Sequence, residues 1–208
     1  MGHVAQKSKL YIGTGTGSAK SITAITQAFR AQVTSSAHGL APGDRVTFAS
    51  VGGMTGINTL VGTVLAADTN TFVVNIDTRA FSAYTSGGTA TPVEWTQVKG
   101  LENFEVTPGE REEVDVTDLD DDERIMELSL KQQGAFSASM NAIPTDAGQT
   151  ACFLAYESSE QKQWKLEYPG ALGGRTFDGQ VRSMPESGAV GAKLQSSFST
   201  TMKNLARY

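Results

Sequence analysis

The sequence predicts an all-β protein with one helix, built from two units of different composition. Short segments alternate apolar and polar side chains with a period of two, which is typical of strands with one buried face. Glycine is frequent, with 22 of 208 residues, and turn-forming sequences separate the alternating segments. Residues 19–92 hold four bases and three acids, whereas the remainder holds 13 bases and 19 acids. This contrast in charge indicates two units.

Residues 19–92 are predicted to form a small inserted β-barrel. Alternating segments at 29–34, 45–48 and 72–77 predict its strands, and no segment shows a helical stripe. Turn sequences, of which residues 39–44 are the clearest, separate these strands. A module of about 70 residues lies near the lower limit for independent stability.

Residues 1–18 and 93–208 are predicted to form the second, discontinuous unit. It begins with a short strand at 10–12 that breaks at Gly13, and it continues through strands at 136–140, 164–168 and 192–202. The last strand is expected to have an apolar face of Ala192, Leu194, Phe198 and Met202. Its other face carries small uncharged groups more than charged ones: Lys193, Gln195, Ser197, Ser199 and Thr201.

One helix is predicted between residues 146 and 160. Either Thr145 or Asp146 can cap its first turn, because both side chains can accept a backbone hydrogen bond. The expected apolar stripe consists of Cys152, Phe153 and Tyr156. The same pattern makes Cys152 a small buried hydrophobe rather than a reactive thiol.

Composition excludes several classes of protein. No apolar run approaches a membrane span, and residues 1–4 lack the pattern of a signal sequence, so we expect a soluble protein made in the cytoplasm. The single cysteine excludes an internal disulfide framework. A net charge of −5 argues against a general nucleic-acid-binding surface, which would need clustered bases.

No catalytic residue, cofactor or metal is predicted. The glycine-rich run 13–21 has Ala19 where a phosphate loop needs glycine, so a flexible linker at the insertion point is favoured. His3 and His38 have no recognisable nucleophile beside them. The acidic run 118–123 lacks the spacing and the turn glycine of a calcium loop.

Residues 105–123 are predicted to form a mobile acidic arm. They hold ten of the 22 carboxylates and only one arginine, Arg111, and like charges repel one another. The alternation at 126–131 that follows predicts a half-buried strand. Three roles remain open for the arm: a protein-interaction arm, a solvated loop, or an electrostatic surface facing something negative. Val114 and Val116 favour the first, because they suit strand addition to a neighbour's sheet edge.

In its second unit, the chain resembles the major tail tube protein of lambda-like, long non-contractile-tailed bacteriophages (siphoviruses). The features that match in order are residues 10–13, 94–101, 107–110, the acidic loop ending at 119–123, the helix from Asp146, residues 164–169, residues 177–179 and the long final strand. The order and spacing of these features carry the resemblance, since no single motif is diagnostic.

The inserted unit resembles a small β-barrel repeat that is named after part of ubiquitin-activating enzyme and is common in phage tail proteins. Residues 34–44, 51–58 and 81–88 carry this likeness. In phage tails the repeat implies no ubiquitin chemistry. Its position near the first strand departs from simpler family members, some of which carry an extra domain at the C-terminus.

The resemblance implies a structural virion protein of the phage tail, made in the bacterial cytoplasm, and not an enzyme. Such subunits form hexameric rings that stack into a tube, and each contributes strands to a ring-shaped barrel around a channel. The implied partners are other copies of the chain, the tape measure, tail tip and terminator proteins, and DNA that passes without specific binding. Alternatives are a tail terminator or baseplate hub of the same fold, or a host-glycan-binding module that would use Phe81 and Tyr84.

The resemblance also assigns roles to two sets of residues. The inter-ring stacking arm would comprise Glu110, Glu112, Glu113, Asp115, Asp118, Asp120, Asp121, Asp122 and Glu123. The candidate lumen-facing strand would present Lys193, Gln195, Ser197, Ser199 and Thr201. Neutralising Asp118, Asp120, Asp121 and Asp122 together is expected to leave a folded subunit that forms tubes poorly.

Overall fold

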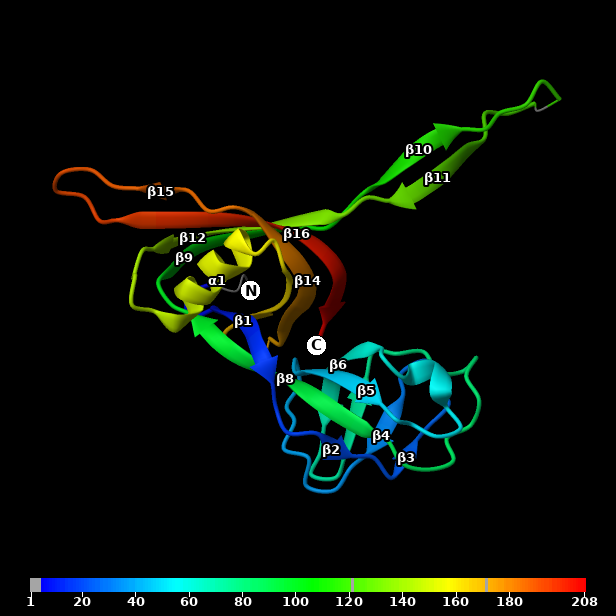
Figure 1. Cartoon of the computed structure of the whole chain (residues 1–208). Coiled ribbons are helices and arrows are strands. Elements are labelled where there is room, and N and C mark those ends of the chain that lie inside the picture. Colours follow the sequence, from blue (N-terminus) through cyan, green and yellow to red (C-terminus); the bar gives the residue numbers. More distant parts are fainter. Residues whose placement is uncertain (1–4, 121, 171) are drawn as a thin grey trace.

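The computed structural model describes residues 5–120, 122–170 and 172–208. It confirms an all-β architecture with one α-helix, in which a 14-stranded antiparallel sheet runs through most of the molecule (Figure 1). The main path of this sheet is β3-β4-β7-β6-β5-β8-β1-β13-β14-β16-β12-β9, with β2 paired to β8 and β15 paired to β16. The path does not return on itself, so the described strands of one chain form no closed barrel.

The insert contributes six short strands and one 3-10 turn. They are β2 Lys20–Ser21, β3 Ala24–Ile25, β4 Gln32–Thr34, β5 Arg45–Ala49, η1 Thr55–Ile57, β6 Val61–Ala67 and β7 Thr71–Val74. These strands follow an open, curved path rather than a closed barrel. Residues 20–25 hydrogen-bond to β8 at their start and to β4 at their end.

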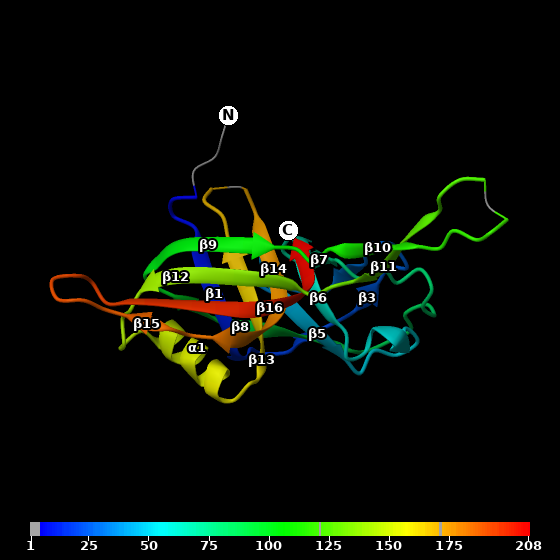
Figure 2. The same cartoon turned by 90° about the horizontal axis from the view of Figure 1, so that it is seen from above.

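The second unit contributes the longer strands. They are β1 Lys9–Thr16, β8 Thr89–Val98, β9 Leu101–Thr107, β12 Gly134–Asn141, β13 Gln161–Glu167, β14 Gly174–Ser183, β15 Glu186–Ser187 and β16 Gln195–Arg207. A separate two-stranded hairpin, β10 Arg111–Asp115 and β11 Met126–Lys131, projects from the body. Figure 2 shows this hairpin and the loop between β15 and β16 extending in opposite directions.

Strands cross the predicted border between the units. The first half of β8 pairs with β5 and β2 of the insert and its second half pairs with β1 of the other unit. The prediction of a flexible linker at 13–21 is wrong at both ends. β1 continues to Thr16 through a bulge between Gly13 and Gly15, and Lys20–Ser21 form β2. A Cβ at Gly13 would lie 2.9 Å from Val93 Cγ1, so the glycine permits this close pairing.

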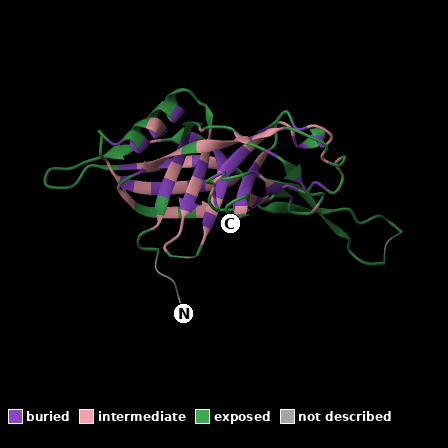
Figure 3. Ribbon diagram, turned by 90° about the horizontal axis from the view of Figure 1, so that it is seen from below, coloured by how far each residue is buried: buried purple, intermediate pink, exposed green. Residues whose placement is uncertain are grey.

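Two separate hydrophobic cores lie along the sheet (Figure 3). In the larger core the Trp164 ring stacks on Phe198 and Phe177, with ring centroids 5.2 Å and 6.3 Å apart. The insert packs a second core around Phe48 and Phe72. Each unit therefore buries its own apolar side chains even though the two share a strand.

The helix is α1 Ala147–Glu157, and Asp146 caps it by accepting a hydrogen bond from the Gln149 amide at 3.0 Å. The predicted apolar stripe is wrong beyond Cys152, since Phe153 and Tyr156 are exposed. The buried face consists instead of Gly148, Gln149, Cys152 and Ala155. Small residues face inward because the helix lies so close to β8 that a Cβ at Gly148 would collide with the Gln97 and Val98 backbone.

The final strand begins and ends later than predicted. Its buried positions are Ser196, Phe198, Thr200, Met202 and Ala206. The predicted inward parity is therefore correct, but Ala192 and Leu194 lie exposed in the preceding loop. Pairing with β14 along residues 199–207 extends the strand beyond Met202.

Polar contacts join the insert to the rest of the protein. The Arg45 guanidinium donates from both terminal nitrogens to the Asp178 carboxylate, at 2.5 Å and 3.1 Å, and Asn204 donates to the same carboxylate at 2.8 Å. Nearby, Lys165 Nζ lies 3.2 Å from Asp44 Oδ1. The insert is thus attached through β8 and also through buried charged groups.

Candidate assembly surfaces

Three neighbouring strands carry mostly small and polar side chains in register on one face. The rows across β9, β12 and β16 are Asn103, Ser139 and Ser197, then Glu105, Ser137 and Ser199, then Thr107, Ala135 and Thr201. All nine side chains are exposed or half-buried. We call this set the polar face.

The opposite side of the same strands faces the larger core. Phe104, Phe136 and Phe198 alternate with the residues of the polar face and pack into that core. A shallow groove on the polar face is bordered by Ser183 of β14, whose hydroxyl lies 2.7 Å from that of Ser199. The alternation thus leaves one side of this layer apolar and packed and the other side polar and open.

The structure places only part of the predicted lumen-facing strand on this face. Ser197, Ser199 and Thr201 belong to it, and Gln195 begins the strand. Lys193 lies before β16 and forms an ion pair with Glu102, and Gln195 donates to the same carboxylate at 3.0 Å. The Lys193 ammonium, with help from Gln195, lowers the pKa of the Glu102 carboxyl.

The sequence pattern alone did not reveal that β9 and β12 contribute to the polar face. Ser137 and Ser139 alternate with apolar residues, and this alternation was a usable signal. Asn103, Glu105 and Thr107 gave a weaker signal because they lie at the start of the acidic segment. Only the strand pairing shows that these residues share a face with β16.

The acidic segment, predicted as a mobile arm, forms a β-hairpin that is separate from the main sheet. We call residues 108–133 the arm; β10 and β11 pair within it through a bulge. Thr117 donates to Asp115 from its hydroxyl at 2.5 Å and from its amide at 3.1 Å, and Arg124 Nε lies 2.9 Å from the same carboxylate. These hydrogen bonds, those from Thr117 first, lower the pKa of Asp115. Local pairing therefore outweighs the charge repulsion in this segment.

The arm exposes apolar side chains on both of its faces. The prediction that 126–131 is half-buried is wrong, because every residue of β11 is exposed. In the described part of the chain no layer covers the ribbon, which extends away from the body (Figure 1). The exposed apolar residues are Val114, Val116, Leu119, Ile125, Met126, Leu128 and Leu130. Exposed apolar side chains gathered on one projection are typical of interaction surfaces.

The predicted stacking residues lie along the whole arm. Glu112, Glu113 and Asp115 are on β10, and Glu110 precedes it. The tip carries Asp118, Asp120, Asp122 and Glu123, all exposed. Asp121 lies outside the described residues.

Among the described residues, few groups outside these surfaces are candidates for metal binding or catalysis. The described residues contain no group of three or more His, Cys, Asp or Glu side chains placed to hold a metal ion. Burial raises the pKa of the Cys152 thiol to about 12, so the thiol is protonated at neutral pH. His38 is buried against Phe72, and its Nδ1 accepts a hydrogen bond from the Leu40 amide at 3.0 Å; His3 lies outside the described residues.

The aromatics that the sequence offers for glycan binding are partly buried. Phe81 and Tyr84 pack against the core of the insert. The Tyr84 hydroxyl lies within hydrogen-bond distance of the backbone carbonyls of Ile22 and Gly87, to which it can donate. Both rings are therefore half-buried, and the Tyr84 hydroxyl is engaged within the insert. Among the described residues, no helix is long and apolar enough to cross a bilayer.

Comparisons with known proteins support the predicted resemblance of the insert. Residues 31–94 match the family model of the ubiquitin-activating enzyme E1 FCCH domain, which confirms that the insert resembles this type of domain. No curated protein matches the chain. The chain is also similar to a chain from a solved structure described as "Tail of empty GTA particle computed with helical refinement, C6 symmetry". The two are 16% identical with a TM-score of 0.46, and the match covers 55% of this chain and 86% of the other.

Proposed function

We propose that this chain is a non-enzymatic structural subunit of a bacteriophage tail, which assembles into stacked hexameric rings that form a tail tube. The resemblance of residues 1–18 and 93–208 to tail tube proteins suggests this role. The polar face is the single structural observation that carries it. A layer with one face packed on its own core and the other face small, polar and open suits the wall of a water-filled channel.

The chemistry of the polar face also suits passing DNA. Its nine side chains include no base, and Glu105 is its single acid. Neutral and negative groups do not attract a phosphate backbone, whereas lysine or arginine would hold it. DNA could therefore move past such a wall without specific binding.

The sheet edges offer a route to ring closure. In the described part of the chain, β9 pairs only with β12, and β15 pairs only with β16. The layer β15-β16-β12-β9 therefore has unpaired edges that a neighbouring copy can extend. Repeating one such contact by rotation closes a ring, and many strands then enclose an aqueous lumen.

The proposed domain organisation suits a tube. We propose that residues 19–92 form a decoration domain and that residues 1–18 and 93–208 form the tube core. Figure 1 shows the insert on the opposite side of the core from β9, β12 and the start of β16. With the polar face toward the lumen, the insert would stand on the outside of the tail, away from the DNA.

Electron microscopy of the purified chain tests this function. We expect negative-stain images of concentrated protein to show rings or hollow tubes with sixfold end views, and size-exclusion profiles to show a matching shift. A tail-tip extract should nucleate tubes where the protein alone is slow. A chain that stays monomeric even with this nucleator would refute the tube role.

A further inference from the structure

We propose that a groove at the base of the arm is the socket for the arm tip of a second copy of this chain. This inference rests on the proposed function, because it specifies how stacked rings contact each other. The groove is bordered by Pro108, Gly109, Lys131, Gln133, Met202 and Lys203, where the arm leaves the sheet and β16 passes beside it. We call it the basal groove.

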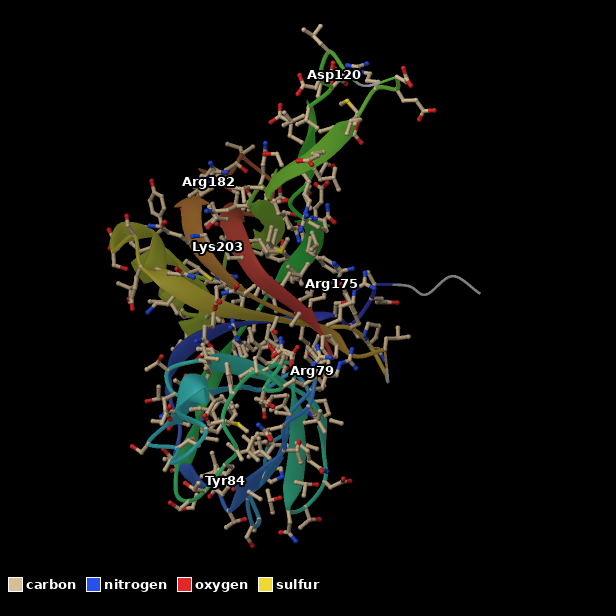
Figure 4. All side chains as sticks on the ribbon, turned by 90° about the vertical axis from the view of Figure 1, so that its right-hand side faces the viewer. Arg79, Tyr84, Asp120, Arg175, Arg182 and Lys203 are labelled. Atoms are coloured by element: carbon tan, nitrogen blue, oxygen red, sulfur yellow. The ribbon has the colours of Figure 1, made fainter. Side chains whose placement is uncertain are left out.

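Basic side chains without an ion-pair partner lie in and near the basal groove, and two of them, Lys131 and Lys203, line it. Among the described residues, no carboxylate lies within ion-pair distance of Arg111, Lys131, Arg182 or Lys203. In the side-chain view, Arg182 and Lys203 lie near each other on β14 and β16 below the arm (Figure 4). Other described bases also lack an ion pair, among them Lys20 and Arg30 on the insert. The basal groove is therefore distinguished by the closeness of its unpaired bases and not by the absence of ion pairs alone.

Two of these bases stand opposite each other. Arg111 and Lys131 are cross-strand partners at the base of the hairpin. Like charges directly opposite one another on paired strands are destabilising. An acidic group from outside the subunit would remove this repulsion, so the base of the arm favours an anionic ligand.

The tip of the arm has the complementary chemistry. Leu119 is fully exposed and is flanked by Asp118 and Asp120, with Asp122 and Glu123 following. The basal groove offers apolar surface from Pro108, Met202 and Leu205 beside the lysines. An apolar plug surrounded by carboxylates therefore matches an apolar groove surrounded by ammonium groups.

The tip cannot fill the groove of its own chain. The arm is an extended hairpin, and about ten residues at roughly 3.3 Å each separate its base from its tip by about 30–35 Å. The matching surfaces must therefore meet between copies. A tip-to-base contact joins two different surfaces, so it is heterologous and can propagate along a stack without closing.

Charge reversal tests the contact. One variant carries Lys131→Glu and Lys203→Glu in the groove, and another carries Asp120→Lys and Asp122→Lys at the tip. A third combines all four changes and so restores opposite charges. We expect each two-site variant to raise the critical concentration for tube formation by about tenfold or more, because like charges then meet. The four-site variant should form tubes near the wild-type concentration.

Matched controls separate this inference from the proposed function. Lys20→Glu with Arg30→Glu makes the same change of charge on the insert and should leave tube formation unchanged. Unfolding curves establish that each variant is folded, and Lys→Gln and Asp→Asn versions repeat the test if a reversed chain does not fold. Wild-type protein that forms no tubes would refute the proposed function itself. Wild-type tubes together with unaffected two-site variants, or with a four-site variant that is not rescued, would overturn the groove assignment.

Discussion

The insert and the arm both extend from the core sheet, but they differ in how their apolar side chains are packed. The insert has its own apolar core and is joined to the sheet through β8 and through buried polar groups. The arm has no core, and its apolar side chains are exposed on both faces. The insert therefore buries its apolar side chains within one chain, whereas the arm leaves its own exposed.

Two ion pairs show the same contrast. Arg45 and Asp178 have side chains that are 3% and 11% exposed, so each charge depends on the other. Arg124 and Asp115 are 72% and 44% exposed, so water and salt screen their attraction. The first pair fixes the orientation of the insert, and the second only helps to shape a hairpin.

The largest expected effect on folding follows removal of the buried charge at the junction. In Asp178→Asn the Arg45 guanidinium stays buried without its counter-ion, which costs about 3–5 kcal/mol of unfolding free energy. Urea denaturation followed by tryptophan fluorescence measures this loss. Asp77→Asn, which disrupts the exposed pair with Arg79, is the matched control and should change little. Equal effects of the two variants would contradict the contrast between the regions.

A second substitution tests the junction without altering charge. Gly43 has a φ of +88°, and a Cβ there would overlap the Tyr208 ring. Gly43→Ala should therefore cost about 1–3 kcal/mol of unfolding free energy through strain and overpacking. Gly39→Ala is a useful comparison, because Gly39 also has a positive φ but open space around its Cβ. Thermal unfolding of the pair separates backbone strain from the clash, and identical losses would mean that Tyr208 does not pack against this turn.

A smaller effect concerns the core beneath the helix. Burial raises the pKa of Cys152 from 9.0 to about 12, so the folded chain holds this proton more tightly than the unfolded chain. The resulting stabilisation is fully present below pH 9 and is lost as the pH rises toward 12. Between about pH 8 and about pH 10 the loss should be about 1 kcal/mol. Urea denaturation at both pH values should show a shallower alkaline decline in Cys152→Ala, and equal declines would argue against a buried thiol.

The smallest effect on folding is expected in the arm. Leu128→Ser with Leu130→Ser removes two exposed apolar side chains, so the unfolding free energy should change by about 0.5 kcal/mol or less. Tube formation, however, should decline strongly, because these side chains would be buried only between copies. Denaturation curves and sedimentation of assembled material measure the two effects on one preparation. Normal sedimentation would show that the apolar faces of the arm remain in solvent after assembly.

The sequence predicted most of what depends on local patterns. Strand alternation, the Asp146 cap and the buried Cys152 follow from side chains within a few residues of each other, and the structure agrees. The linker at 13–16 and the stripe with Phe153 and Tyr156 were wrong for a non-local reason. In both cases a close contact with a distant strand, to Val93 for Gly13 and to β8 for Gly148, decided the outcome.

Taken alone, the sequence determined the all-β class, the single helix, the two compositions and the acidic character of the arm, since these depend on composition and short-range periodicity. Tertiary structure decided which strands share a face and which charges meet. The polar face combines residues of different strands that are about 28 to 94 positions apart, and the Arg45–Asp178 pair spans 133 positions. Strand register brings such residues together, and register is set by packing across the whole sheet.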